Sequence, residues 1–106
     1  MIPTGFEILP PWSALPVDRA ELLTVRLQRE LPRGHALYGI TARAVASRTD
    51  RDDVLFELES SSMQLAVVHL TWRVETDPRW PSSKLFCNWQ EWAAQEMYPN
   101  HDEFTL

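Results

Sequence analysis

Three residues of this chain are suited to acid–base chemistry: Arg43, Glu57 and His69. Histidine titrates near neutral pH, and a neighbouring carboxylate can orient its ring for proton transfer. If the three residues stand near the middle of adjacent strands, cross-strand neighbours come within about 5 Å of one another. A slip of one residue in the strand register would disperse them. The pattern predicts a candidate binding face, with a small-molecule site or minor hydrolytic site as the alternative to protein binding.

Aromatic residues in irregular segments form a second group of candidates. Trp12 and Trp80 lie in proline-rich stretches, and Tyr38 precedes Gly39 in a connecting loop. Trp and Tyr are typical anchors of protein interfaces, although they also pin loops to their own domain. We therefore treat Trp12, Trp80 and Tyr38 as candidate binding residues and leave both interpretations open.

The chain carries no complete motif for a metal or cofactor. A single Cys87 can form neither an intrachain disulfide nor a cysteine-rich zinc site. The aspartates between positions 50 and 53 lack the glycine and the final glutamate of a calcium loop. No second histidine stands at helical spacing from His101. We expect no cofactor, no bound metal and no catalytic residue.

Two helices are indicated by apolar residues at helical spacing. The first is predicted over residues 18–31, because Asp18 is a favourable cap residue and Pro32 ends the apolar stripe. The second is predicted over residues 88–97, with Asn88 as its cap.

Three strands are predicted over residues 40–48, 54–59 and 64–72, because apolar and polar residues alternate there. Polar turn residues at 49–53 and 60–62 separate the strands. Short connections between consecutive strands favour an antiparallel meander.

These elements predict an α+β fold, a three- to four-stranded antiparallel meander with an N-terminal and a C-terminal helix on one face. Residues 1–106 are expected to form a single domain. Within it, residues 1–16 are expected to form a proline-rich extended arm that packs on the body.

The two faces of the predicted sheet differ in composition. The helices are expected to cover the face that carries Ala42, Phe56, Val68 and Leu70. The opposite face, which carries Arg43, Glu57 and His69, is more apolar than a solvated sheet face requires. We expect the arm, a partner protein or a second copy of the chain to cover it.

The composition limits the classes of partner. The chain has 106 residues, with 10 Lys and Arg against 15 Asp and Glu, for a formal net charge of −5. This balance disfavours contacts with a phosphate backbone. The longest uncharged apolar run, residues 65–68, is far shorter than the roughly 20 residues of a membrane helix. The start of the chain also lacks the pattern of a signal peptide. We expect a cytoplasmic globular protein with no nucleic-acid and no membrane partner.

Four segments carry a resemblance: LYG at 37–39, DDVLFEL at 52–58, VVHLTW at 67–72 and PRWP at 78–81. Together they resemble a group of short uncharacterised bacterial proteins, over residues from about 10 to 100. None of the segments is an active-site signature. The resemblance implies a bacterial globular domain and assigns no activity.

Negative charge, a mixed sheet face and loop tryptophans, without a complete catalytic group, favour a binding role over an enzymatic one. We expect a protein-binding or self-associating module without catalysis, whose partner is another protein or a second copy in a homodimer.

Overall fold

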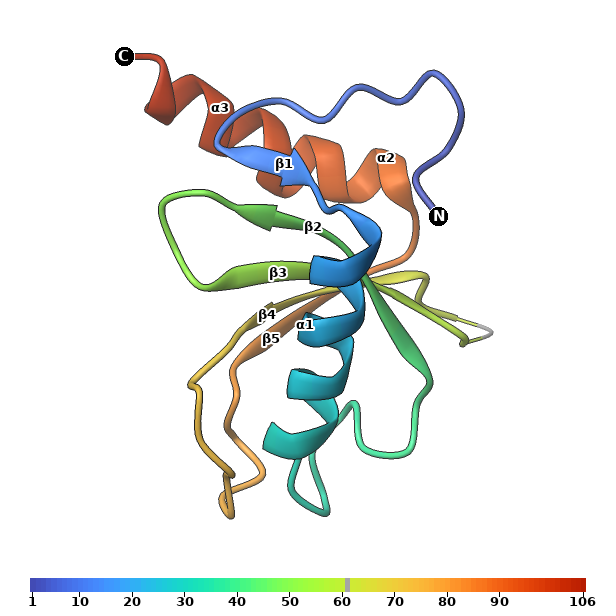
Figure 1. Ribbon diagram of the computed structural model, residues 1–106. Coiled ribbons are helices and arrows are strands. Elements are labelled where there is room, and N and C mark those ends of the chain that lie inside the picture. The colour runs from blue at the N-terminus through green and yellow to red at the C-terminus, as the bar shows by residue number, and fades with distance from the viewer. Residues whose placement is uncertain (61) are drawn as a thin grey trace.

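The computed structural model describes residues 1–60 and 62–106, and within them five strands form one antiparallel sheet (Figure 1). The strands follow one another in chain order: β1 (Trp12–Ala14), β2 (Ala42–Arg48), β3 (Asp53–Leu58), β4 (Leu65–His69) and β5 (Ser83–Phe86). The three central strands confirm the predicted meander. The predicted count of three to four strands is too low, because both edge strands are short and lie in segments with little alternation. The predicted turn at 60–62 lies partly outside the described residues.

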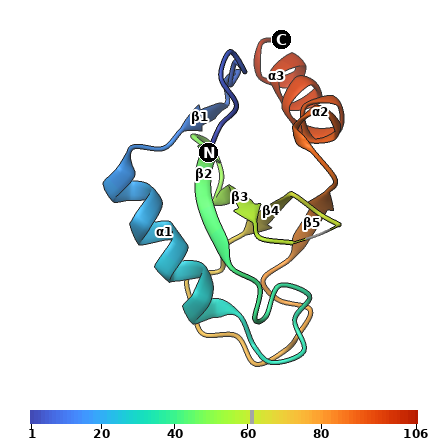
Figure 2. The same ribbon diagram turned by 90° about the vertical axis from the view of Figure 1, so that its right-hand side faces the viewer.

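The helices lie on opposite faces of the sheet. Helix α1 (Val17–Glu30) covers one face, and α2 (Trp89–Trp92), the π-helix η1 (Ala93–Met97) and α3 (Tyr98–Phe104) together cover the other (Figure 2). The prediction that both helices share one face is therefore wrong. It fails because the central strands are apolar on both sides, as in sheets that are covered on both faces.

The direction of most central side chains agrees with the predicted alternation. The exception in β2 is Ala46: strict alternation would place it beside Ala42, but beyond the irregularity between Ala44 and Ala46 it packs in the second core. Ala42, Phe56, Val68 and Leu70 pack in one core with Leu23 and Leu27 of α1. Their neighbours along the strands pack in a second core with the C-terminal helices: Leu55, Leu65 and Val67 against Trp89, Trp92 and Met97.

Helix α1 begins one residue before its predicted start. Pro16 occupies the cap position without a side-chain hydrogen bond, and Asp18 accepts only from the adjacent Arg19 N–H at 2.9 Å. Buried Leu23 and Leu27 attach the helix to the sheet, so packing replaces the expected cap as the stabilising contact.

The C-terminal helical segment is longer than predicted. Asn88 caps it as expected, since its Oδ1 accepts from Glu91 N–H at 2.8 Å. Pro99 does not end the segment, which continues to Phe104. The wider π turn precedes Pro99, which then stands in the first turn of α3, where a missing N–H breaks no helical bond.

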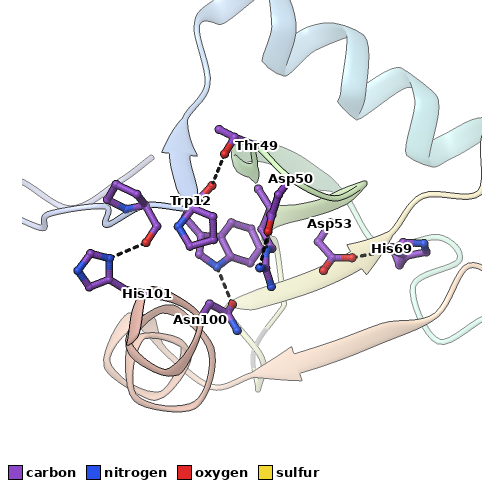
Figure 3. A network of polar contacts seen from close by, with 10 residues as sticks. Trp12, Thr49, Asp50, Asp53, His69, Asn100 and His101 are labelled. Carbon is purple, nitrogen blue, oxygen red and sulfur yellow. Dashed lines mark hydrogen bonds and ion pairs between the residues drawn. The ribbon is translucent and has the colours of Figure 1, made fainter. Parts of the chain in front are cut away.

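The N-terminal arm lies along the C-terminal helices. Ile2, Phe6, Ile8 and Leu9 are partly buried against the second core. Trp12, at the end of the arm, donates its indole N–H to Asn100 Oδ1 at 2.8 Å, and His101 Nδ1 donates to a carbonyl of the arm at 2.6 Å (Figure 3). The second sheet face is therefore covered largely from within the chain. Over the residues described here, no helix combines the length and the apolar character that a bilayer crossing needs.

Candidate functional site

The strand register separates His69 from Arg43 and Glu57. Arg43 lies opposite Glu57, whereas His69 lies opposite Asp53. Asp53 and Glu57 are four residues apart on β3, which corresponds to about 13 Å along a strand. Glu57 instead pairs with the N-terminal ammonium of Met1. The three predicted residues thus do not form one site, and the acid–base chemistry expected of them has no geometric basis.

His69 has a different acidic neighbour. Its Nδ1 donates to Asp53 Oδ1 at 2.7 Å (Figure 3), and its main-chain N–H donates to the Ser82 carbonyl at 3.0 Å. A carboxylate on β3, an imidazole on β4 and the serine that directly precedes β5 therefore follow one another across this edge of the molecule. They border a hollow of about 170 Å³ that also includes Lys84 and Glu96. Sequence reasoning missed this row because it depends on the register.

The three aromatic candidates divide into one buried and two exposed residues. Trp12 is only 2% exposed, so its side chain is not available as an interface anchor. Tyr38 and Trp80 are 51% and 46% exposed, as a contact surface requires. Trp72, which lies in the segment predicted as a strand over residues 64–72 but beyond the end of β4 at His69, is 45% exposed. It follows the end of β4 and has a positive φ of 62°.

Tyr38, Trp72 and Trp80 belong to two loops at the same end of the molecule, residues 31–41 and 70–82 (Figure 1). We call these two segments the loop end. At Gly34 a side chain would stand 3.5 Å from Pro78 Cβ, so the loops approach each other closely. Gly34 also has a positive φ of 89°, a conformation that favours glycine.

Glu30, the last residue of α1, holds the second loop from inside the molecule. Its carboxylate is fully buried. Oε1 accepts from Thr71 N–H at 2.8 Å and from Thr71 Oγ1 at 3.0 Å, and Oε2 accepts from Trp72 N–H at 2.9 Å. Arg26 Nε donates to the same Oε2 at 2.9 Å, and its guanidinium lies 5.6 Å from the centroid of the Trp72 ring. The backbone of Trp72 and one face of its ring are thus fixed by α1.

His35 joins the two loops. Its Nδ1 accepts from Leu37 N–H at 3.0 Å, so its Nε2 carries the proton and donates to the Pro81 carbonyl at 2.7 Å. The ring is buried. Tyr38 N–H donates to the His35 carbonyl at 3.0 Å, and Pro81 directly follows Trp80. A buried imidazole therefore sets the separation of the loops that carry these two aromatic residues.

The charge of the chain is unevenly distributed. The loop end contains three arginines and two acidic residues, for a formal charge of +1, while the other residues carry −6. Asp77 and Arg79 form an ion pair in this region at 2.7 Å, and the hydrogen bond from Arg79 lowers the pKa of Asp77 to about 2. Arg33 is exposed. The loop end is the more basic part of an acidic protein.

The described residues give no support for metal or thiolate chemistry. Within the two ranges 1–60 and 62–106, no three His, Cys, Asp or Glu side chains gather as a metal site would need. Cys87 is exposed, and its pKa is raised by a side-chain hydrogen bond with Glu91 and by the negative charge of that residue. A raised pKa disfavours the nucleophilic thiolate.

The fold and the site define an α+β domain with an antiparallel sheet covered on both faces and an aromatic loop end. A scan against protein-family models and searches of curated proteins and of solved structures found no match to this chain. The resemblance to short bacterial proteins stays a prediction.

Proposed function

We propose that the protein is a protein-binding module without catalysis and that the loop end is its contact surface. The observation that carries this proposal is the combination of exposed aromatic rings with a backbone fixed from inside by Glu30 and His35. A Trp or Tyr side chain buries about 150–250 Å² when enclosed. Each half-exposed ring thus leaves on the order of 100 Å² in water, worth about 2–3 kcal/mol when a partner covers it.

The rigidity of the loops supports binding as well. Association loses free energy when loops must be ordered, and loops that are already fixed avoid much of that loss. Glu30 and His35 bond to the backbone on both sides of the exposed rings, at Thr71, Trp72 and Pro81. The backbone that carries these rings is therefore fixed before any partner arrives.

The charge distribution indicates the chemistry of the partner. The loop end has a formal charge of +1, whereas the other residues of the chain together carry −6. We infer that the partner surface is apolar in its centre and neutral to acidic at its rim, because electrostatic complementarity steers association.

The test compares two serine variants of matched exposure. Trp80→Ser changes the loop end, and Phe104→Ser changes an exposed ring on α3. Wild type and both variants are immobilised and exposed to an extract of cells that express the protein. A captured protein is then purified and its affinity measured by calorimetry. We expect Trp80→Ser to weaken binding at least about tenfold, since hot-spot truncations exceed 2 kcal/mol. Equal affinity for wild type and Trp80→Ser would refute the proposal.

A competing function rests on the row of Asp53, His69 and Ser82. Asp53 orients the His69 ring, and Ser82 lines the same hollow, so a carboxylate, an imidazole and a hydroxyl, the three groups of an acyl-transfer site, lie together there. In such a reaction Ser82 Oγ would attack an ester carbonyl while His69 Nε2 takes its proton and passes it to the leaving alkoxide. Water would then hydrolyse the acyl-serine.

A fluorophosphonate probe tests this alternative without a known substrate. Covalent labelling of Ser82, located by mass spectrometry and abolished by His69→Ala, would favour the hydrolytic function. An unlabelled Ser82 would exclude it and leave the binding function.

A further inference from the structure

The outer side of α1 carries a self-complementary pattern. Asp18, Leu22, Val25 and Arg29 recur every three or four residues and therefore line one side of the helix. All four are exposed, and both apolar residues are more than half exposed. Figure 2 shows α1 as the outermost element on its side of the sheet. This stripe thus faces away from the core that α1 covers.

The order of the stripe from its N-terminal end is acidic, apolar, apolar, basic. Its centre falls between residues 23 and 24, so Asp18 and Arg29 stand at equal distances from it, and so do Leu22 and Val25. A second copy laid antiparallel would place its Arg29 opposite Asp18 and its Val25 opposite Leu22. In a parallel arrangement, like charges would meet instead. The pattern therefore selects one orientation.

We propose that the protein forms a homodimer in which two α1 helices pack antiparallel about a two-fold axis beside residues 23 and 24. Asp18 and Arg29 are 11 residues apart, or about 16 Å along the helix. Two ion pairs between the copies would flank the central contact of Leu22 and Val25. Such an isologous interface closes on itself, as two-fold dimers do. Antiparallel helix dipoles favour the same arrangement.

The neighbouring charges fit this geometry. Glu21 lies on the same side of α1 near Asp18, where it adds to the attraction for Arg29 of the second copy. Arg26 is not needed for the contact, because its Nε already donates to Glu30 within the chain. Arg29 forms no ion pair with any residue in the described part of its own chain, so its charge is available to a second copy.

An apolar groove continues the interface beside the helix. It has a volume of about 880 Å³ and includes Val25 together with Leu15, Val17 and Ala20. An interface made of one helix pair and the adjoining groove buries a small area compared with the interfaces of stable dimers. We therefore expect dissociation in the micromolar range, with a monomer at high dilution.

Sedimentation equilibrium on the full chain tests the dimer with two charge reversals. Asp18→Arg and Arg29→Asp each place like charges opposite one another in a homodimer. Each is expected to weaken self-association at least about tenfold. Mixed in equal amounts, the two variants restore both ion pairs across a heterodimer, so the mixture should dimerise with an affinity close to that of wild type. Both residues are exposed, and far-UV circular dichroism checks that the variants fold.

Glu103→Arg is the matched control. It makes the same change of charge as Asp18→Arg, but on exposed α3 and away from α1, and should leave the dimer unaffected. A wild-type chain that stays monomeric up to about 1 mM would overturn the proposal. So would a dimer that is indifferent to both reversals, or a mixture that stays monomeric. Trp80→Ser should not alter this dimer, which separates it from binding at the loop end.

Discussion

Removal of the buried carboxylate of Glu30 is expected to destabilise the protein and to release the loop formed by residues 70–82. The Glu30 carboxylate accepts four hydrogen bonds, from Arg26 Nε, Thr71 N–H, Thr71 Oγ1 and Trp72 N–H. In Glu30→Ala these donors lose their acceptor, and Arg26 is left as a mostly buried charge without its counter-ion. Removing one partner of a buried ion pair costs about 3–5 kcal/mol. This is a large share of the roughly 5–15 kcal/mol that stabilises a domain.

The assay is urea unfolding followed by far-UV circular dichroism and by tryptophan fluorescence. If the same proteins are unfolded by heat instead, a loss of about 3–5 kcal/mol corresponds to a fall in melting temperature of at least about 12 °C. Glu30→Gln retains one acceptor oxygen and should fall between wild type and Glu30→Ala. Gln28→Ala, on the exposed side of the same helix, should change stability by no more than about 0.5 kcal/mol. A loss below about 1 kcal/mol for Glu30→Ala would refute this account of the loop.

Three further predictions concern His35, Cys87 and Asp77. His35→Phe leaves Leu37 N–H and the Pro81 carbonyl without their partner and should lower the free energy of unfolding in urea by about 2–4 kcal/mol. An unchanged unfolding midpoint would contradict the role of this ring. Glu91 raises the pKa of Cys87, so Glu91→Gln should lower that pKa and speed alkylation of the thiol by iodoacetamide at a fixed mildly alkaline pH, with intact-mass spectrometry as the measurement. The hydrogen bond from Arg79 lowers the pKa of Asp77. The Asp77–Arg79 pair therefore stabilises the fold fully above the ordinary carboxyl range, and this stabilisation is lost as the pH falls from that range through about 2. An NMR titration of the Asp77 carboxyl carbon should show that midpoint, and Arg79→Ala should return it toward the ordinary value.

The sequence was sufficient to predict the central elements and the direction of most of their side chains. The helical spacing of Leu23 and Leu27 identified the apolar side of α1, and the alternation through Phe56 and Val68 identified the sheet face beneath it. Both signals are local, because each depends on the fixed period of one element. The cap at Asn88 was predictable for the same reason.

The arrangement of the layers and the site depended on contacts between distant segments. The apolar second sheet face was visible in the sequence, but its cover depends on the path of the chain between β4 and α2. The register also shifts between Ala44 and Ala46, and β3 places His69 opposite Asp53 rather than Glu57. No local pattern specifies such pairings.

The exposure of the tryptophans followed tertiary partners rather than local pattern. Trp12 is enclosed because Asn100, far along the chain, accepts its indole N–H. Trp72 is turned outward because Glu30 fixes its backbone in a left-handed conformation. Glu30 itself looked like an ordinary surface residue of a helix. A buried carboxylate of this kind is recognisable only once its donors are in place.

The proposal that the loop end binds another protein is tested most directly by site-specific photo-crosslinking in cells that express the protein. A benzophenone amino acid replaces Tyr38 in one variant and Phe104 in another, two side chains that are both 51% exposed. We predict that irradiation joins the Tyr38 variant to a protein other than a second copy of this chain, and that the Phe104 variant forms no such adduct. An absence of adducts at position 38, or the same adducts at both positions, would contradict the account.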